Sequence, residues 1–155
     1  MATKVLMVCL GNICRSPMAE GLLRHKVRQL SLDIETDSAG TAGYHIGSKP
    51  DHRMIETAAK FGVDISDLRA RQFKPTDLDE FDYIFAMDKE NQVNMQRLAK
   101  NENGREKVRL FLDHVDYPNH DEVPDPYYGS MKDFEFVFNM LDDATDKFIE
   151  TLKKQ

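Results

Sequence analysis

Short apolar runs that alternate with segments of helical periodicity are the feature that most constrains how this chain folds. The runs predict four strands, at residues 5–9, 34–39, 83–87 and 108–112. The intervening segments predict helices from Pro17, between Asp51 and Gly62, over 89–100 and across the apolar stripe at 134–149. Such alternation forms a parallel sheet covered on both faces. We therefore predict a single α/β domain over residues 1–155, flavodoxin-like and doubly wound, with a four-stranded parallel sheet.

Capping residues set the expected helix starts. Ser16 is the expected N-cap of the first helix, because Pro17 suits the first helical position, where its missing N–H costs nothing. Asp51 and Asp88 are the expected N-caps of the second and third helices. Gly62 is expected to stop the second helix.

The carboxyl ends of parallel strands meet at one edge of a sheet, and sites in such folds lie beyond that edge. Cys9 ends the first predicted strand, Ser38 lies at the end of the second, and Asp88 follows the third. A loop over residues 113–130 leaves the fourth. We therefore expect these residues to lie close together, although they are far apart in the sequence.

Composition argues against several classes of protein. The formal net charge of -6 disfavours a nucleic acid partner, which normally requires a basic face. No apolar run approaches the length of a membrane span, and the N-terminus lacks the long apolar region of a signal peptide. The 2 cysteines cannot make a disulfide scaffold, and the 5 histidines show no zinc-site spacing. We expect a cytoplasmic protein without a metal or other cofactor.

The turn after the first strand, Cys-Leu-Gly-Asn-Ile-Cys-Arg-Ser, carries reactive groups that a simple turn does not need. In this segment, called the 9–16 loop below, Gly11 allows close backbone approach and Asn12 tolerates left-handed dihedral angles. A curled loop of this kind points successive N–H groups inward as an anion nest, beside the positive end of a helix. Arg15 can donate two hydrogen bonds to a tetrahedral oxyanion. The loop therefore suits a dianion such as phosphate.

The same environment favours the thiolate of Cys9, so that Cys9 can act as a nucleophile at neutral pH. Ser16 can donate its hydroxyl to the sulfur and stabilise it as a leaving group. A thiolate that faces a bound phosphate indicates phosphoryl transfer to sulfur, followed by hydrolysis. The alternative is a buried structural cysteine, which would have little use for Arg15 nearby.

These residues resemble the phosphate loop of the low molecular weight protein tyrosine phosphatases. The resemblance rests on Cys-Leu-Gly-Asn-Ile-Cys-Arg-Ser-Pro (9–17) and continues through Asp-Ser-Ala-Gly-Thr (37–41), Arg-Gln (71–72), Asp-Tyr-Ile-Phe-Ala-Met-Asp (82–88) and Asp-Pro-Tyr-Tyr-Gly (125–129). It implies a metal-independent protein-tyrosine phosphatase that forms a cysteinyl-phosphate on Cys9, with Arg15 binding the phosphoryl group. It also implies a substrate site that includes Leu10, Gly11, Asn12, Ile13, Cys14 and Ser16.

Asp125 is the candidate proton donor. Pro124 and Pro126 stiffen its loop and bias it to extended geometry, which would hold the carboxyl group over the nest. From the residues alone, an ordinary surface turn is an equally good interpretation. The resemblance implies that Asp125 is the general acid for the leaving phenolate and then the general base for the attacking water.

Three tyrosines are expected around the mouth of the site. The resemblance implies that Tyr44, Tyr127 and Tyr128 line a cleft for an aromatic ring, although tyrosines in exposed turns often have no role. Many relatives carry Trp where this chain has Tyr44, so the wall of the cleft differs here.

Two residues are expected to support the loop. A strained Asn12 needs hydrogen bonds to its side chain, and Ser38 is the expected partner because it ends the adjacent strand. Asp88 is the second supporting residue. Leu68 stands where eukaryotic relatives carry a His that helps to hold the loop, so this part of the network differs.

Cys14 has two interpretations. Because it lies in the same curled loop as Cys9, it can form a reversible disulfide that protects Cys9 from overoxidation. It can equally be a small buried filler. The resemblance favours the redox role.

Three other functions use a similar loop. Thiol-coupled arsenate reductases share the Cys-x5-Arg nest but need further cysteines, and none follows Cys14. Protein-arginine phosphatases carry Thr where this chain has Ile13. A non-enzymatic anion-binding module would need neither Cys9 nor Asp125. We therefore expect tyrosine-phosphorylated proteins or peptides as partners, no binding to nucleic acid or membranes, and a monomer or weak homodimer.

Overall fold

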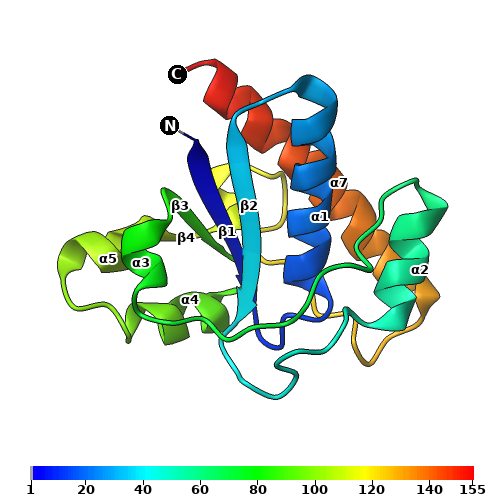
Figure 1. The fold of residues 1–155 in the computed structure, drawn as a ribbon, viewed down its shortest axis with the longest axis horizontal. Coiled ribbons are helices and arrows are strands. Elements are labelled where there is room, and N and C mark those ends of the chain that lie inside the picture. The colour runs from blue at the N-terminus through cyan, green and yellow to red at the C-terminus, as the bar shows by residue number, and fades with distance from the viewer. Residues whose placement is uncertain (1) are drawn as a thin grey trace.

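The computed structural model describes residues 2–155 and contains a four-stranded sheet between two layers of helices (Figure 1). The strands are β1 (Thr3–Cys9), β2 (Ile34–Gly40), β3 (Tyr83–Ala86) and β4 (Val108–Leu110), in the spatial order β2-β1-β3-β4. Every neighbouring pair of strands is parallel. The predicted fold class is confirmed.

Helices cover both faces of this sheet. One layer contains α1 (Arg15–Leu30), α2 (His52–Lys60) and α7 (Met131–Lys153), and the other contains α3 (Asp77–Glu80), α4 (Lys89–Gln96) and α5 (Glu102–Lys107) (Figure 1). The short helix α6 (Phe111–His114) directly follows β4. Figure 1 also shows that the loops after β1 and β2 leave the sheet at the same edge.

The side chains of β1 explain why both faces are covered. Val5, Met7 and Cys9 pack into the core that includes α1 and α7 residues, whereas Leu6 and Val8 pack into the core that includes α3 and α4 residues. Successive side chains of a strand point to opposite faces. A strand that is buried on both faces therefore has a continuous apolar sequence, as residues 5–9 do.

The strand register brings the ends of β1 and β2 together. Cys9 pairs with Gly40, and Val8 pairs with Ala86 of β3. A Cβ atom at Gly40 would lie 2.8 Å from the carbonyl oxygen of Leu10. Only glycine therefore allows the 9–16 loop to run this close to the end of β2.

Two of the three expected N-caps are confirmed and one is wrong. The side chains of Asp51 and Asp88 accept backbone N–H groups of the first turns of α2 and α4, at 2.9 and 2.8 Å. Helix α1, however, begins at Arg15, with Cys14 in the cap position and no side-chain cap. Ser16 cannot cap this helix because it lies inside the first turn, where its hydroxyl is hydrogen-bonded within the 9–16 loop.

Several element ends differ from the prediction. Strand β3 ends one residue early, and β4 ends at Leu110 because Phe111 and Leu112 belong to α6. Both residues are fully buried in that helix. A short apolar run does not distinguish a strand from a helix. Helix α4 ends at Gln96 rather than near Lys100, since the backbone N–H groups of Leu98 and Ala99 bond to the third residue back. Helices α3 and α5 were not predicted, and α5 buries none of its residues and so has no apolar stripe.

Candidate active site

A cavity of about 340 Å³ opens at the edge of the sheet where β1 ends. Its lining comes from the 9–16 loop, from the loop after β2 and from the loop after α6: Cys9, Leu10, Gly11, Ile13, Cys14, Arg15, Tyr44, His45, Asp125, Tyr127 and Tyr128. The structure therefore brings most of the predicted site residues together. Asn12 and Ser16 belong to the same loop but lie outside this lining, because their side chains are buried and hydrogen-bonded to each other.

Cys9 occupies the end of β1, at the base of the 9–16 loop. Its side chain is 2% exposed, and its Sγ lies 3.0 Å from the hydroxyl oxygen of Ser16. Helix α1 starts at Arg15, so the positive end of a 16-residue helix faces the same loop. The sulfur thus has a hydroxyl group and a helix N-terminus close by, and both favour a negative charge.

Arg15 is a buried cation that is held in place by its neighbours. Its Nη1 donates to Asp88 Oδ2 at 2.6 Å and to the carbonyl oxygen of Val123 at 3.0 Å. Its Nη2 lies 3.7 Å from Asp125 Oδ2. Burial lowers the pKa of Arg15, but the charge of Cys9 and the hydrogen bond to Asp88 outweigh it and raise the pKa above its ordinary value. Arg15 therefore remains charged and oriented at the cavity.

Asp88 has two structural roles, one at each carboxylate oxygen. Oδ1 accepts the backbone N–H of Asn91 at the start of α4, and Oδ2 accepts the hydrogen bond from Arg15. The capping role could be predicted from the sequence. The ion pair with Arg15 could not, because it depends on how close the ends of β1 and β3 lie in space.

Asn12 holds the 9–16 loop in a left-handed turn, with φ of 56°. Its Nδ2 donates to Ser16 Oγ at 2.8 Å and to Ser38 Oγ at 2.9 Å, and its Oδ1 accepts the backbone N–H of Arg71 at 3.0 Å. The expected Asn12–Ser38 pair is therefore present. These three hydrogen bonds use both donor hydrogens and the oxygen of the amide, which stabilises a strained backbone position.

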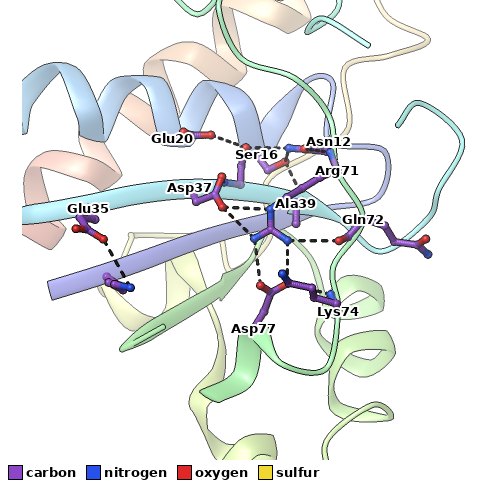
Figure 2. A network of polar contacts seen from close by, with 12 residues as sticks. Asn12, Ser16, Glu20, Glu35, Asp37, Ala39, Arg71, Gln72, Lys74 and Asp77 are labelled. Carbon is purple, nitrogen blue, oxygen red and sulfur yellow. Dashed lines mark hydrogen bonds and ion pairs between the residues drawn. The ribbon is translucent and has the colours of Figure 1, made fainter. Parts of the chain in front are cut away.

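The segment that carries Arg71 is fixed against β2. The guanidinium group of Arg71 lies between Asp37 and Asp77, with contacts of 3.0 to 3.2 Å (Figure 2). The carbonyl oxygen of Arg71 accepts the N–H of Gly40 at 2.9 Å. Leu68, which stands where eukaryotic relatives carry a His, packs against the apolar core. The backbone of Arg71 thus supplies a fixed donor to Asn12.

Asp125 lies on the loop of residues 123–130, called the acid loop below. Val123 N–H donates to Met87 O and ties the start of this loop to the end of β3, and Gly129 N–H donates to Pro126 O and closes a turn within the loop, each at 2.8 Å. The N–H of Tyr127 donates to Asp125 Oδ1 at 3.1 Å. The other carboxylate oxygen, Oδ2, is the one that approaches Arg15.

Aromatic rings surround the mouth of the cavity. Tyr44 is 78% exposed and Tyr128 is 96% exposed, so both rings are available to a ligand. Tyr127 is more enclosed, and its ring meets that of Tyr128 edge-on with centroids 5.0 Å apart. His45, which sequence reasoning did not identify, lines the cavity beside Tyr44.

Arg53 connects helix α2 to the acid loop and was also missed. Its guanidinium carbon lies 5.5 Å from the centroid of the Tyr127 ring and 4.5 Å from that of Phe134 in α7. Asp51 holds the same group through two side-chain hydrogen bonds of 3.0 and 2.8 Å. A cation between two rings is attractive, so Arg53 ties the acid loop to two helices. Its signal in the sequence, one Arg near a cap, is too weak to find.

Cys14 is buried, and both cysteines are free thiols in this structure. Burial, together with the negative charges of Asp51, Cys9 and Asp125, raises the pKa of the Cys14 thiol far above its ordinary value, although Arg53 lowers it. Cys14 is therefore held as a neutral thiol. Its redox role stays a prediction.

Residues 2–155 contain neither a candidate metal centre nor a helix that could span a membrane. Within that range, no cluster of three or more His, Cys, Asp or Glu side chains has the arrangement of a metal site. Over the same residues, every helix is too short or too polar to span a bilayer.

Comparison with known proteins agrees with the geometry of this site. A family model described as low molecular weight phosphotyrosine protein phosphatase matches residues 4–155. A relative from Synechocystis sp., named for a low molecular weight protein-tyrosine-phosphatase, is 45% identical, with 98% of each chain covered. The crystal structure of a protein tyrosine phosphatase from Entamoeba histolytica has a TM-score of 0.92 at 37% identity, covering 99% of this chain and 98% of that one.

The crystal structure of YfkJ from Bacillus subtilis also gives a TM-score of 0.92, at 38% identity, and covers 99% of this chain and 96% of that one. These matches confirm the expected enzyme class, a protein-tyrosine phosphatase. The chain therefore belongs to the low molecular weight phosphotyrosine protein phosphatase family.

Proposed function

We propose that this protein hydrolyses phosphotyrosine in proteins or peptides through a cysteinyl-phosphate intermediate on Cys9. One observation carries the proposal: a buried thiol, a buried guanidinium group and a carboxyl group line the same cavity. They belong to Cys9, Arg15 and Asp125. A nucleophile, a cation for the phosphoryl oxygens and a proton donor are the groups that displacement at phosphorus by a thiolate requires.

The phosphate dianion binds in the 9–16 loop. The N–H groups of a curled loop, the N-terminus of α1 and the guanidinium group of Arg15 all attract negative charge. Asp88 and the carbonyl oxygen of Val123 restrain Nη1 of Arg15, so the cation is oriented before the substrate arrives. Donors that are already in place lose little energy to reorganisation during the reaction.

In the first step the thiolate of Cys9 attacks phosphorus on the side opposite the tyrosine oxygen. The S–P bond forms as the bond between phosphorus and the phenolic oxygen breaks. Asp125 donates its proton to that oxygen, so tyrosine leaves as a neutral phenol. The side chain of Asp125 is 44% exposed, which leaves it accessible to the departing group.

In the second step water attacks the phosphorus of the cysteinyl-phosphate. The carboxylate of Asp125 accepts a proton from this water, and the S–P bond breaks to give inorganic phosphate. Cys9 leaves as a thiolate. The hydroxyl of Ser16, 3.0 Å from the sulfur, can donate to the charge that returns there.

The lining of the cavity favours an aromatic ester over a phosphoguanidine. Tyr44 and Tyr128 present exposed rings, and Ile13 presents a stiff, apolar, β-branched side chain. The N–H groups of phosphoarginine would face that apolar surface without partners, at a cost of about 1–3 kcal/mol. This corresponds to a preference for phosphotyrosine of roughly tenfold to a hundredfold.

We further propose that residues 1–155 act as one domain in the cytoplasm, as a monomer or weak homodimer, without a metal or other cofactor. Cys9, Arg15 and Asp125 supply the nucleophile, the charge and the proton transfer, which supports a mechanism that uses only the chain itself. Two free thiols are consistent with a reducing compartment.

The test compares wild type with Cys9→Ser on a phosphotyrosine peptide and on the same peptide carrying phosphoarginine. We expect wild type to hydrolyse the phosphotyrosine peptide with a kcat/KM at least about tenfold higher. Cys9→Ser should lose turnover, because serine is a far weaker nucleophile here, yet still bind orthovanadate or phosphate in calorimetry.

Far-UV circular dichroism and binding of the anion show that Cys9→Ser is folded. Substantial residual hydrolysis by that folded variant would refute Cys9 as the nucleophile. Equal wild-type rates on the two peptides would refute the preference for phosphotyrosine, and a faster rate on the phosphoarginine peptide would favour a protein-arginine phosphatase.

A further inference from the structure

Glu20 is a buried carboxyl group that the mechanism above does not use. It lies on α1, one helical turn after Ser16, and is 6% exposed. Its Oε1 accepts a hydrogen bond of 2.6 Å from the hydroxyl of Ser38. Figure 2 shows Glu20 at one end of a chain of polar contacts that reaches Ser16 and Asn12. A carboxyl group in a protein core is unfavourable unless it is hydrogen-bonded, so its position requires an explanation.

The hydrogen bonds from Glu20 to Asn12 have a defined direction. A carboxylate can only accept, so the hydroxyl hydrogen of Ser38 points toward Glu20. The oxygen of Ser38 then offers only lone pairs to Asn12, whose Nδ2 donates to it at 2.9 Å. At the other side of the amide, Asn12 Oδ1 faces the backbone N–H of Arg71, which can only donate. The amide is thus fixed from both sides.

This direction continues to the sulfur of Cys9. The second hydrogen of Asn12 Nδ2 is donated to Ser16 Oγ at 2.8 Å. Ser16 therefore accepts from Asn12 and keeps its own hydrogen for another acceptor. Cys9 Sγ lies 3.0 Å away, whereas the carbonyl oxygen of Ala39 lies at 3.4 Å. Because the contact with sulfur is the shorter one, the hydroxyl of Ser16 donates its hydrogen bond to the sulfur, and this bond stabilises the thiolate.

We propose that Glu20 is a positioning residue for the nucleophile. Its carboxylate sets the direction of the hydrogen bonds that run through Ser38 and Asn12, so that the hydroxyl of Ser16 donates to Cys9. Glu20 touches neither the substrate nor the reacting atoms. The inference rests on the proposed function, because it assumes that the thiolate of Cys9 is the nucleophile.

The charged groups around Glu20 make this role dependent on pH. Burial raises the pKa of Glu20 to about 7, although the hydrogen bond from Ser38 lowers it. Asp37 on β2 and Asp67 on the loop after α2 raise it further, and Arg24 on α1 lowers it. When Glu20 takes up a proton, its hydroxyl group can donate to Ser38. The direction of the hydrogen bonds from Glu20 to Asn12 is then less strictly fixed. The ionised form is therefore the one that positions Ser16.

The experiment measures kcat and KM for a phosphotyrosine peptide from about pH 5 to about pH 8, in wild type, Glu20→Gln and Glu20→Met. Gln is neutral like the protonated acid, so the ratio of wild-type to Glu20→Gln kcat should be near one at low pH. It should rise to about tenfold at high pH, the lower end of the effect of residues that orient an active group. Its midpoint should lie near pH 7, the pKa of Glu20. Glu20→Met lacks an acceptor and should lose activity at both extremes.

A second arm tests whether Glu20 acts through Ser38. If it does, Glu20→Gln should cause no further loss in a Ser38→Ala background, so the two losses should not multiply. Thr145→Val is the control for a buried hydrogen bond far from the loop, in α7, and its kcat ratio to wild type should not vary with pH.

Three results would overturn the proposal: a ratio that is constant with pH, losses that multiply in the double variant, or the same pH dependence in Thr145→Val. Circular dichroism identifies any variant that fails to fold. If Glu20→Gln fails, Glu20→Met and the titration of Glu20 by carbon-13 NMR in the unmodified chain replace it, and a midpoint far below pH 7 refutes the role. Wild-type turnover and its loss in Cys9→Ser report on the proposed function separately.

Discussion

At the scale of single residues, the proposed chemistry depends on a guanidinium group and a carboxyl group that lie close together. Arg15 Nη2 and Asp125 Oδ2 are 3.7 Å apart, one on a buried helix start and the other on an accessible loop. This short distance allows the phosphoryl oxygens to lie near Arg15 while the leaving oxygen is within reach of Asp125. The roles proposed for these residues rest on where their polar atoms lie in the cavity.

Replacement of Asp125 should affect substrates according to their leaving groups. A poor leaving group needs a proton from the enzyme, whereas p-nitrophenolate hardly does. We therefore expect Asp125→Asn to lower kcat by a hundredfold or more (about 10² to 10³) on phenyl phosphate and far less on p-nitrophenyl phosphate. Steady-state kinetics over a series of aryl phosphates measures this.

Asp121→Asn is the matched control, since Asp121 lies just before the acid loop and forms an exposed ion pair with Lys89. Its rates should stay close to those of wild type across the series. Equal losses on every substrate in Asp125→Asn would mean that Asp125 only positions the substrate.

At the scale of secondary structure elements, long periodic segments could be predicted and short ones could not. Strand β1 and helix α7 each bury many apolar side chains at a regular spacing, which defines them in the sequence. Helices α3 and α6 have 4 residues each, too few for a period to show. Their existence depends on tertiary packing of the chain that follows β2 and β4.

The same distinction applies to the site. Residues at the ends of strands, such as Cys9 and Ser38, could be placed at one edge because parallel strands share that edge. The ion pair between Arg15 and Asp88 and the backbone donor at Arg71 could not, since both depend on distances between segments that are far apart in the sequence. Glu20 had a weak signal, its place one turn after Ser16 on the same helix face.

The acid loop and helix α2 should be coupled through Arg53. Its guanidinium carbon lies 5.5 Å from the centroid of the Tyr127 ring, and such cation–π contacts are attractive but weak at accessible sites. We therefore expect Arg53→Gln to lower kcat by roughly two- to fivefold on phenyl phosphate, because the loop that carries Asp125 is held less firmly. On p-nitrophenyl phosphate, which needs little protonation, the loss should be smaller.

Lys60→Gln is the control for this prediction, because Lys60 is on the same helix and loses an exposed ion pair with Glu135. Its kcat should match wild type on both substrates. If Arg53→Gln shows a lower melting temperature but unchanged kcat on phenyl phosphate, Arg53 is structural only.

At the scale of the whole molecule, the ionised form of the buried Glu20 opposes stability. Its pKa is raised from 4.5 to about 7 in the folded state, so the folded state binds a proton more tightly than the unfolded chain. This tighter proton binding stabilises the folded state. The stabilisation is fully present below pH 4.5 and is lost as pH rises through about 7. At higher pH the fold must accommodate a buried carboxylate.

Glu20→Gln should remove this pH dependence. Relative to the variant, wild type should lose up to about 3 kcal/mol of unfolding free energy between acidic and mildly alkaline pH, at about 1.4 kcal/mol for each pKa unit. Urea unfolding curves at both ends of this range measure it. Glu135→Gln, an exposed carboxylate, is the control. An unfolding free energy difference between wild type and Glu20→Gln that does not change with pH would contradict the account.

The covalent intermediate is the central claim, and one measurement tests it most directly. Wild type is mixed with a phosphotyrosine peptide, quenched in acid within a single turnover, digested, and analysed by mass spectrometry for phosphorylated residues. We predict a transient phosphoryl group on Cys9, formed together with the first equivalent of tyrosine peptide and absent from Cys9→Ser. A phosphoryl group on any other residue, or a full first turnover with no phosphorylated enzyme at any quench time, would contradict the account.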